Sequence, residues 1–301
     1  IRSVAGWVLC QIQLGKHVSK GILYVVATPI GNLDDITFRA VKVLQSVDLI
    51  AAEDTRHSRL LLRYHGIGTP VMAMHEHNEQ VVMEQLLERL AAGQCLALIS
   101  DAGTPLISDP GFVLVREARR RGMQVVPVPG ASAVMCALSA AGLPTDRFLF
   151  TGFPPRQSAQ RQRWLAGLAR GTETLVFYES SHRIVAALED LVKVLGPQRQ
   201  AVIAREMTKL YETFLQGSVG ELLERVSQDE DQRKGEFVLL IQGIAPQDVD
   251  EVTLHTEPLL QAFAEELPIK TAAKLAAKIT GQKRNDLYKR ILFIKESKGV
   301  N

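Results

Sequence analysis

The chain has 301 residues, of which 46% are hydrophobic and 23% charged; this composition is typical of a globular protein and excludes a largely disordered one. The net charge is +2, and no apolar run approaches the roughly 20 residues that cross a bilayer, which excludes a membrane-spanning helix. At about 100 to 200 residues per domain, the length predicts two domains, or two with an appendage.

The first twenty residues carry basic side chains around a short apolar patch. A targeting signal would have a longer apolar core and a small-residue cleavage site, so we interpret 1–20 as an extension outside the fold. Cys10, Cys95 and Cys136 match no metal-ligand spacing, and the last two lie in apolar stretches. This pattern favours buried thiols in a reducing compartment, and we expect a cytoplasmic protein.

Short apolar runs alternate with helical patterns in the first half of the chain. The predicted strands are 21–27, 48–52, 71–74, 96–99 and 125–128. One helix is predicted to start at 34 or 35. Three more are predicted at 78–91, at 109–121 with Asp109 as the N-cap, and at 133–141. This alternation predicts a parallel sheet with helices on both faces, and we assign 21–143 to an N-terminal α/β domain.

Polar or glycine-containing loops follow three strands of this sheet, at 28–32, 101–108 and 129–133. Ligands bind beyond the carboxyl ends of the strands in such sheets. The loops therefore predict a small-molecule site, with Asp101, Gly103, Thr104 and Ser108 among its residues. The alternative is a set of tight turns that use Gly and Pro only for their backbone angles. None of the loops has the dinucleotide or phosphate-loop pattern.

A second α/β domain is predicted at 144–244. Its strands are expected at 148–151, 174–178, 200–204, 211–216 and 236–242, and its helices at 158–169, 181–195 and 218–227. The strands at 200–204 and 211–216 leave no room for a crossover helix between them, so this sheet should be mixed.

A polar linker leads to a helical C-terminal module at 252–298, with helices expected at 256–266, 269–279 and 284–296. The last two, around Gly281, resemble a helix-turn-helix. Residues 268–298 carry a net charge of +7 and the remainder −5. A basic end on an acidic body is typical of a protein that binds a polyanion, although a plain solvated helical hairpin remains an alternative.

Five motifs occur in order along the chain: 23-Leu-Tyr-Val-Val-Ala-Thr-Pro-Ile-Gly-Asn, 51-Ala-Ala-Glu-Asp-Thr-Arg-His, 100-Ser-Asp-Ala-Gly-Thr-Pro-Leu-Ile-Ser-Asp-Pro-Gly, 143-Leu-Pro-Thr-Asp-Arg-Phe and 177-Phe-Tyr-Glu-Ser-Ser-His-Arg. They resemble the ribosomal RNA small subunit methyltransferase I family, a branch of the tetrapyrrole methylase superfamily. The resemblance covers about 21–296. It implies two α/β domains with a cofactor cleft between them, plus the small helical module.

The resemblance also implies S-adenosylmethionine as the methyl donor and the ribose 2′-hydroxyl of a cytidine in the decoding region of small-subunit ribosomal RNA as the acceptor. It further implies a homodimer. Carried over by position, the donor-binding residues are Pro29, Gly31, Asp101, Gly103, Thr104, Pro105, Ser132, Ala133, Phe177 and Ala204, the last two through backbone groups.

Methyl transfer to a hydroxyl benefits from a group that orients or deprotonates it. Candidates at strand ends are Glu53, Asp54, Arg56, Glu179, His182, Arg183, Glu206 and Lys209. We predict that Glu53 or Glu206 acts on the hydroxyl while Arg56, Arg183 and Lys209 bind phosphate. Lys274, Lys278, Lys283 and Arg284 of the C-terminal module are further predicted RNA contacts. For each strand-end residue, a structural ion pair is the alternative.

Other polar groups are weaker candidates. His75 and His77 flank Glu76, but two histidines without further ligands at a set spacing make a poor metal site, and we predict no metal. Arg156, Arg161 and Arg163 near Trp164 could contact RNA or form a solvated helix face.

Two other functions compete with this interpretation. One is methylation of a tetrapyrrole, against which the basic C-terminal module argues. The other is a non-catalytic ribosome-associated factor that senses S-adenosylmethionine; such a factor would bind the donor without turnover.

Overall fold

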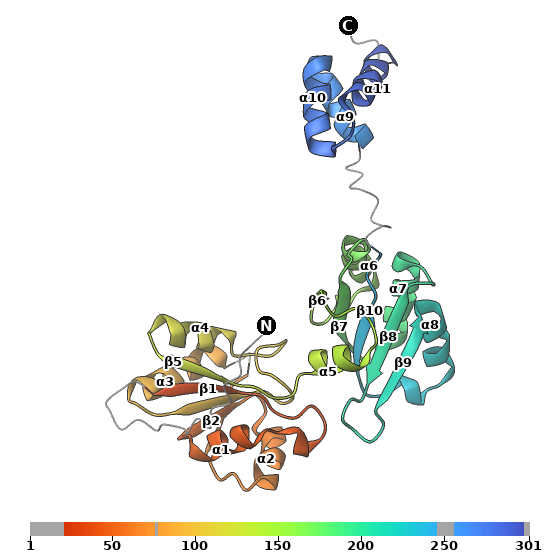
Figure 1. Ribbon diagram of the computed structural model, residues 1–301. Coiled ribbons are helices and arrows are strands. Elements are labelled where there is room, and N and C mark those ends of the chain that lie inside the picture. Colours follow the sequence, from red (N-terminus) through yellow and green to blue (C-terminus); the bar gives the residue numbers. More distant parts are fainter. Residues whose placement is uncertain (1–20, 76–77, 246–255, 298–301) are drawn as a thin grey trace, which may run out of the picture. The chain divides into compact units, whose positions relative to one another are not determined.

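The computed structural model describes residues 21–75, 78–245 and 256–297. The predicted extension at 1–20, together with Glu76 and His77, lies outside the described residues. The chain divides into two compact units, one ending at Gly243 and the other beginning at Ile244. Figure 1 gives the labels of their helices and strands.

The first unit begins with a five-stranded sheet whose strands are all parallel, as predicted. Its strands are β1 (Ile22–Val26), β2 (Leu49–Ala52), β3 (Val71–Ala73), β4 (Leu96–Ile99) and β5 (Gln124–Val128). Their order is β3-β2-β4-β1-β5. All carboxyl ends therefore lie at one edge of the sheet.

Helices cover both faces of this sheet (Figure 1). They are α1 (Phe38–Ser46), α2 (Thr55–Tyr64), α3 (Glu79–Ala91) and α4 (Phe112–Arg120). Successive side chains of a strand point to opposite faces. Accordingly, Leu96 and Leu98 of β4 pack with α3 and α4, while Ala97 and Ile99 pack with α1 and α2. A strand with both faces buried reads as a continuous apolar run, which is why β4 was predictable.

A second five-stranded sheet follows in the same unit, and it is mixed, as predicted. Its strands are β6 (Phe148–Phe150), β7 (Thr174–Ser180), β8 (Gln200–Arg205), β9 (Thr213–Ser218) and β10 (Glu236–Ile241). The order is β6-β7-β10-β8-β9, and β6 and β7 form the parallel pair.

The two faces of the second sheet are covered by different parts of the chain. On one face pack α6 (Ser158–Leu168), α7 (Ile184–Leu195) and α8 (Val219–Gln228). On the other packs α5 (Ala133–Ala140), whose Val134, Ala137 and Leu138 contact apolar residues of β7, β8 and β10. The boundary at 143 stays a prediction; the helix that precedes it packs on the second sheet.

The second unit contains α9 (Thr256–Glu266), α10 (Ile269–Thr280) and α11 (Arg284–Ser297). It has an apolar core of its own, built from residues such as Leu260, Ala273 and Leu287. Gly281 ends α10 with φ of 70°, a left-handed conformation that favours glycine. Within the described residues, no helix is long and apolar enough to cross a membrane.

The structure differs from the predicted elements at several helix starts, at one strand (β9, predicted at 211–216) and in one additional helix. A 3-10 turn, η1 (Leu33–Asp35), occupies the predicted start at 34, and α1 begins at Phe38. The helix expected from Asp109 begins at Phe112, because Gly111 has φ of 114° and an added Cβ there would lie 2.8 Å from Leu98 Cδ2. The helix α2 was not predicted. A second short turn, η2 (Asp231–Arg233), precedes β10.

Candidate functional site

A cavity of about 480 Å³ lies at the carboxyl edge of the first sheet, and the second sheet supplies its other wall. The lining residues are Ile30, Glu53, Asp101, Ala102, Gly103, Thr104, Ile107, Ser108, Asp109, Ser132, Ala133, Phe153, Tyr178, Glu179, Ser180, Ser181, Met207, Gly235, Glu236, Phe237 and Val238. The cavity therefore takes residues from loops after β1, β2, β4 and β5 and from strands β7 and β10.

Hydrogen bonds tie the loops of the first sheet to one another. Thr28 and Gly103 exchange two backbone hydrogen bonds, of 2.9 and 3.1 Å. Thr104 Oγ1 donates to the carbonyl of Ala131 at 3.0 Å. Gly103 has φ of 82°, and an added Cβ would lie 3.3 Å from Ile30 Cγ2. Because glycine has no Cβ, Gly103 can adopt this positive φ and lets the loop that carries Ile30 approach closely.

Two acidic residues follow neighbouring strands, Glu53 after β2 and Asp101 after β4, and both line the cavity. The backbone N–H of Asp54 donates to Asp101 Oδ1 at 3.0 Å. The Asp101 carboxylate is therefore held by the backbone at the beginning of α2. Asp54 itself caps α2, since Asp54 Oδ1 accepts from the Arg56 N–H at 2.8 Å.

Two loops beside the cavity contain backbone in the left-handed region. Among the described residues, the non-glycine positions with positive φ are Leu106 (75°), Ser108 (72°), Glu206 (50°) and Thr208 (64°). Such conformations cost on the order of 1–3 kcal/mol each and gather at functional sites. Here they occur in the loop after β4 and in the β8–β9 connection, on the two sides of the cavity.

The second sheet presents aromatic and acidic groups to the cavity. Burial, with a further contribution from the charge of Asp109, raises the pKa of Tyr178 to about 12. Burial also raises the pKa of the Asp109 carboxyl, and the neighbouring charge of Asp101 adds to the effect. Phe150 and Phe153 pack against the ring of Tyr178, with centroids 5.0 and 5.4 Å away. The Tyr178 hydroxyl is therefore neutral near pH 7, and two aromatic neighbours pack against its ring.

Half of the predicted donor-binding residues line the cavity: Asp101, Gly103, Thr104, Ser132 and Ala133. The others, Pro29, Gly31, Pro105, Phe177 and Ala204, are not among its lining residues. Phe177 and Ala204 are buried in the cores on the two faces of the second sheet. An added Cβ at Gly31 would lie 2.5 Å from Lys209 Cγ and 2.7 Å from Thr208 Oγ1, so this glycine lets the first loop touch the β8–β9 connection.

Glu206 and Lys209 are paired with each other. Lys209 Nζ lies 2.9 Å from Glu206 Oε1 and 2.9 Å from Glu236 Oε2. Burial alone would raise the pKa of Glu206, but the hydrogen bonds from Lys209 and from the Glu236 N–H hold it below its usual value. The Glu206 carboxylate is not a cavity-lining group. This arrangement matches the structural ion pair considered as the alternative.

Arg183 is also engaged within the protein. Its guanidinium contacts the buried Glu179, with Nε 3.0 Å from Oε1, and donates to the carbonyl of Pro154 at 2.9 Å. Arg161, considered above as an RNA contact or part of a solvated face, is neither: its side chain is 4% exposed and forms an ion pair with Asp190.

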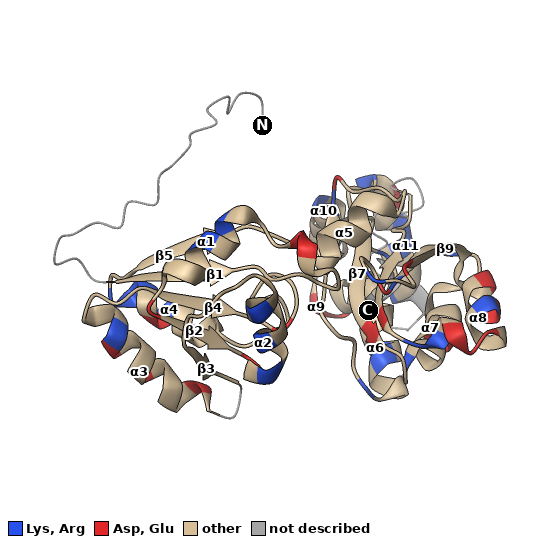
Figure 2. Ribbon diagram, turned by 90° about the horizontal axis from the view of Figure 1, so that it is seen from below, with Lys and Arg blue, Asp and Glu red and all other residues tan. Residues whose placement is uncertain are grey.

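Other predicted RNA contacts are at the surface. Arg56 is 86% exposed and pairs with Asp54 at 3.0 Å. The hydrogen bond from Arg56 lowers the pKa of Asp54 to about 2. Lys274, Lys278, Lys283 and Arg284 are exposed on α10, on α11 and between them. Figure 2 shows the blue basic residues of these helices. In the part of the chain that the structure describes, no three acidic, histidine or cysteine side chains form a metal-binding group.

Residues from the second sheet were the main omission of the sequence analysis. Tyr178, Phe153 and Met207 line the cavity, yet none was a predicted site residue. One signal was available for Tyr178: side chains alternate along a strand, so a core position at Phe177 puts Tyr178 on the opposite face. Ser108 was predicted at the site and lines the cavity.

Comparisons with known proteins match both units of the chain. Residues 22–223 match the family model of the Tetrapyrrole (Corrin/Porphyrin) Methylases, and residues 250–295 match the RsmI C-terminal HTH domain. The chain is 55% identical over 273 residues to Ribosomal RNA small subunit methyltransferase I of Escherichia coli O157:H7, with 90% of this chain and 94% of the relative covered. It is 52% identical to the protein of that name from Xylella fastidiosa Temecula1, with 89% and 98% covered.

Solved structures share the fold of the first unit at low sequence identity. A cobalt precorrin-4 methyltransferase aligns with a TM-score of 0.58 and 20% identity over 76% of this chain and 98% of its own. Diphthine synthase aligns with a TM-score of 0.59 and 17% identity, covering 74% and 90%. Uroporphyrin-III C-methyltransferase from Thermus thermophilus, complexed with S-adenyl homocysteine, aligns with a TM-score of 0.51 and 20% identity, covering 73% and 97%.

Proposed function

The chain belongs to the ribosomal RNA small subunit methyltransferase I family of tetrapyrrole methylases, and on that premise we propose that it methylates small-subunit ribosomal RNA with S-adenosylmethionine as donor. The proposed acceptor is the ribose 2′-hydroxyl of a cytidine in the decoding region. The observation that carries the proposal is the 55% identity, which extends over 90% of the chain.

The residues of the cavity fit S-adenosylmethionine. Small-molecule sites of about 300–1,000 Å³ are usual, and this cavity measures about 480 Å³. The carboxylate of Asp101 would favour a cationic sulfonium, and Ile30, Met207 and other apolar residues would offer surface to an uncharged ring. The bound donor would supply an electrophilic methyl group. The loops that carry Asp101, Gly103, Thr104, Ser132 and Ala133 would hold it.

The protein's contribution to methyl transfer is first one of position. In-line displacement needs the accepting oxygen, the carbon and the leaving sulfur on one line, and fixed geometry of this kind supplies much of an enzyme's acceleration. Hydrogen bonds at Thr28, Gly103 and Thr104 join the loops on this side of the cavity and would hold the donor in a fixed position. On the opposite wall, Tyr178 is packed against the rings of Phe150 and Phe153.

Of the two predicted catalytic carboxylates, we assign Glu53 to the acceptor hydroxyl. Glu53 lines the cavity, whereas Glu206 is held by Lys209 outside it. Glu53 would orient the 2′-hydroxyl and take up its proton. We assign to Glu206 and Lys209 the role of holding the β8–β9 connection, whose backbone is in the left-handed region at Glu206 and Thr208.

The basic helices α10 and α11, together with Arg56, supply the RNA-binding charges in this proposal. The matching RsmI C-terminal HTH domain covers Lys274, Lys278, Lys283 and Arg284. We also propose that the enzyme is cytoplasmic and works as a homodimer; the homodimer is what the family resemblance implies.

The test is methyl transfer from labelled S-adenosylmethionine to small ribosomal subunits that lack the modification, with naked small-subunit RNA in parallel and nucleosides identified by mass. We expect 2′-O-methylcytidine on the RNA. Donor binding without any methylated ribose on either substrate would overturn the proposal and favour a tetrapyrrole acceptor or a sensor. A tetrapyrrole methylase would then turn over a porphyrin precursor, and a sensor would produce no S-adenosylhomocysteine.

A further inference from the structure

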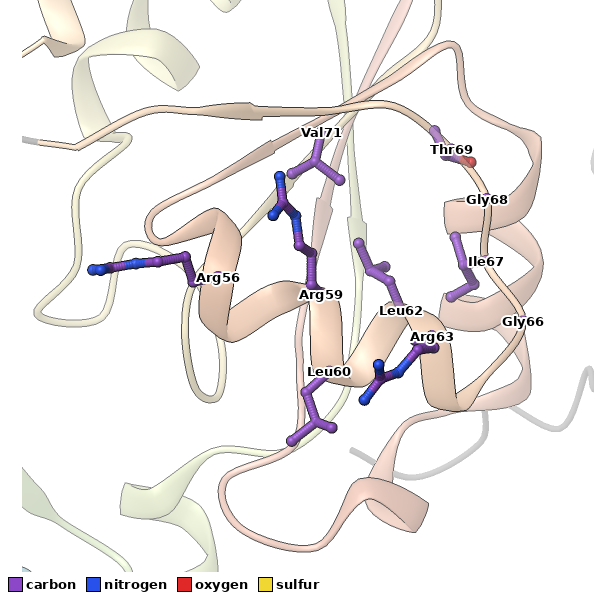
Figure 3. A pocket seen from close by; sticks show the side chains of 10 residues that line it. All are labelled: Arg56, Arg59, Leu60, Leu62, Arg63, Gly66, Ile67, Gly68, Thr69 and Val71. Atoms are coloured by element: carbon purple, nitrogen blue, oxygen red, sulfur yellow. The ribbon is translucent and has the colours of Figure 1, made fainter.

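A second hollow, of about 720 Å³, lies on the first unit between α2 and the loop that leads to β3. Figure 3 shows the residues that line it, among them Arg56, Arg59 and Arg63 from α2. Only Arg56 was singled out from the sequence. The hollow is separate from the donor cavity, because the two share no lining residue.

The arginines form a row on one side of the helix. Their spacing of three and then four residues places them on the same face. At 1.5 Å per residue, the row extends about 10 Å along the helix axis. All three are exposed, and α2 contains no acidic residue. The row therefore presents a strip of positive charge to solvent.

Little negative charge offsets this strip. Asp54, at the N-cap, pairs with Arg56. Within the ranges that the structure describes, no carboxylate pairs with the guanidinium groups of Arg59 and Arg63. Arginine forms bidentate hydrogen bonds with phosphate, which makes exposed and unpaired guanidinium groups suited to a phosphate backbone.

The other wall of the hollow is open. An added Cβ at Gly66 or Gly68 would meet no described atom within 4 Å. Leu60, 54% exposed, adds apolar surface beside the arginines. A shallow strip with arginines along one side fits an elongated polyanion, whereas a small anion would need a closed cup of donors. A strand of nucleic acid has this form, since its phosphates recur every few ångströms.

The strip also begins at the donor cavity. Glu53, which lines the cavity, is two residues before the first residue of α2, and the Asp54 N–H donates to Asp101. Arg56 lies in the first turn of the helix. A nucleic-acid strand along α2 would therefore lead toward the cavity that holds the proposed acceptor.

We propose that the α2 arginine row (Arg56, Arg59 and Arg63) binds the phosphate backbone of ribosomal RNA next to the nucleotide that enters the cavity. This inference rests on the proposed function and names part of its RNA-binding surface. The row acts on RNA affinity and on the placement of the strand, and it leaves donor binding unaffected.

The experiment compares the full-length protein with a triple variant, Arg56→Gln, Arg59→Gln and Arg63→Gln. A control variant carries Arg116→Gln, Arg119→Gln and Arg120→Gln on the exposed side of α4, so that both lose three positive charges. Binding to a small-subunit RNA transcript is measured from 50 to 300 mM salt. The KM and kcat for methylation of small subunits and the affinity for S-adenosylhomocysteine are measured alongside.

We expect the α2 variant to bind RNA at least tenfold more weakly, with the slope of log affinity against log salt reduced by about two, since each phosphate contact contributes about 0.7 to 0.9. Its KM should rise with S-adenosylhomocysteine affinity unchanged. If the α4 variant loses RNA affinity to the same extent, the loss reflects the change in net charge alone, and the proposal is overturned. So would wild-type RNA binding by the α2 variant with loss only on assembled subunits, which would assign the row to a ribosomal protein. If the wild-type protein neither binds nor methylates the RNA, the proposed function itself fails.

Discussion

Asp101 and Glu53 have different expected roles, and single substitutions separate them. Asp101→Ala removes the acceptor of the Asp54 N–H and a negative group of the cavity, so donor affinity should fall about tenfold or more. Glu53→Gln keeps the size of the side chain and removes its proton-accepting charge, so kcat should fall about 100-fold or more with donor affinity nearly unchanged. Calorimetry with S-adenosylmethionine and steady-state methylation measure the two effects.

Thermal unfolding of both variants serves as the control, because a folding defect would lower donor affinity and kcat together. Undiminished turnover in both variants would remove the assignment of this cavity as the active site.

The Asp54–Arg56 pair makes a prediction about pH. The hydrogen bond from Arg56 holds the pKa of Asp54 at about 2, below the ordinary 3.8. A lowered pKa means that the folded state favours the ionised cap. The contribution to stability is therefore complete above about pH 4 and is lost as the pH falls through 2. In an NMR titration, Arg56→Gln should raise the pKa of Asp54 toward its ordinary value; an unchanged pKa would mean that the helix backbone alone holds the charge.

Site residues were predictable where one rule connects sequence to position. Asp101, Gly103 and Thr104 follow a buried strand, and the carboxyl edge of a parallel sheet is where ligands bind. Alternation along β7 gives only the face on which Tyr178 lies. That Tyr178 and Phe153 line the cavity depends on how the second sheet packs against the first. The pairing of Glu206 with Lys209 is the alternative that the sequence left open, since either side chain could equally have faced a ligand.

Among the elements, α2 shows what pattern reading overlooked. Its buried residues are Ser58, Leu61 and Leu62. Because the exposed Leu60 precedes Leu61 and Leu62, the sequence shows three consecutive leucines at 60–62 instead of apolar residues at helical spacing. After the apolar run at 48–52, Asp54 and Thr55 resemble the polar end of a strand as much as the start of a helix. The starts of α1 and α4 were also misplaced, because a glycine with positive φ or a 3-10 turn intervenes. The strands, with continuous apolar runs, were located to within a few residues.

The helices α6 and α7 are joined by a buried ion pair that can be tested by stability. Arg161 Nη2 lies 2.6 Å from Asp190 Oδ2, and Ser158 and Gln162 also donate to this carboxylate. Removing one partner leaves a buried charge uncompensated, which typically costs 3–5 kcal/mol. Arg161→Met should therefore lower the free energy of unfolding in denaturant titration by about that amount. The matched change Arg163→Met, at an exposed position, should cost less than about 1 kcal/mol.

At the scale of the whole molecule, positive charge is concentrated in residues 268–298, which carry a net charge of +7. Substitution of Lys274, Lys278, Lys283 and Arg284 by Gln should weaken RNA binding and reduce its salt slope by up to about three. Donor affinity should stay at the wild-type value, because the second unit has its own core and the cavity is lined by residues of the first. Filter binding across a salt series and calorimetry measure the two quantities. An unchanged salt slope would mean that these four side chains remain hydrated in the complex.

The architecture was predictable at this scale because its signals are long. Five apolar runs alternating with helices predict a parallel sheet, and two strands too close for a crossover predict a mixed one. The cavity between the sheets could be expected only from the family resemblance. The way in which two sheets pack against each other does not change the hydrophobic periodicity of the sequence in either of them.

The hydrogen bond from the Asp54 N–H to Asp101 has a thermodynamic consequence. One acceptor group belongs both to the donor cavity and to the start of the helix that carries the arginine row. Coupling between two binding sites is reciprocal, so whatever factor the donor applies to RNA affinity, RNA applies to donor affinity. A change at Asp101 that alters this coupling therefore alters the effect of the donor on RNA affinity and the effect of RNA on donor affinity by the same factor.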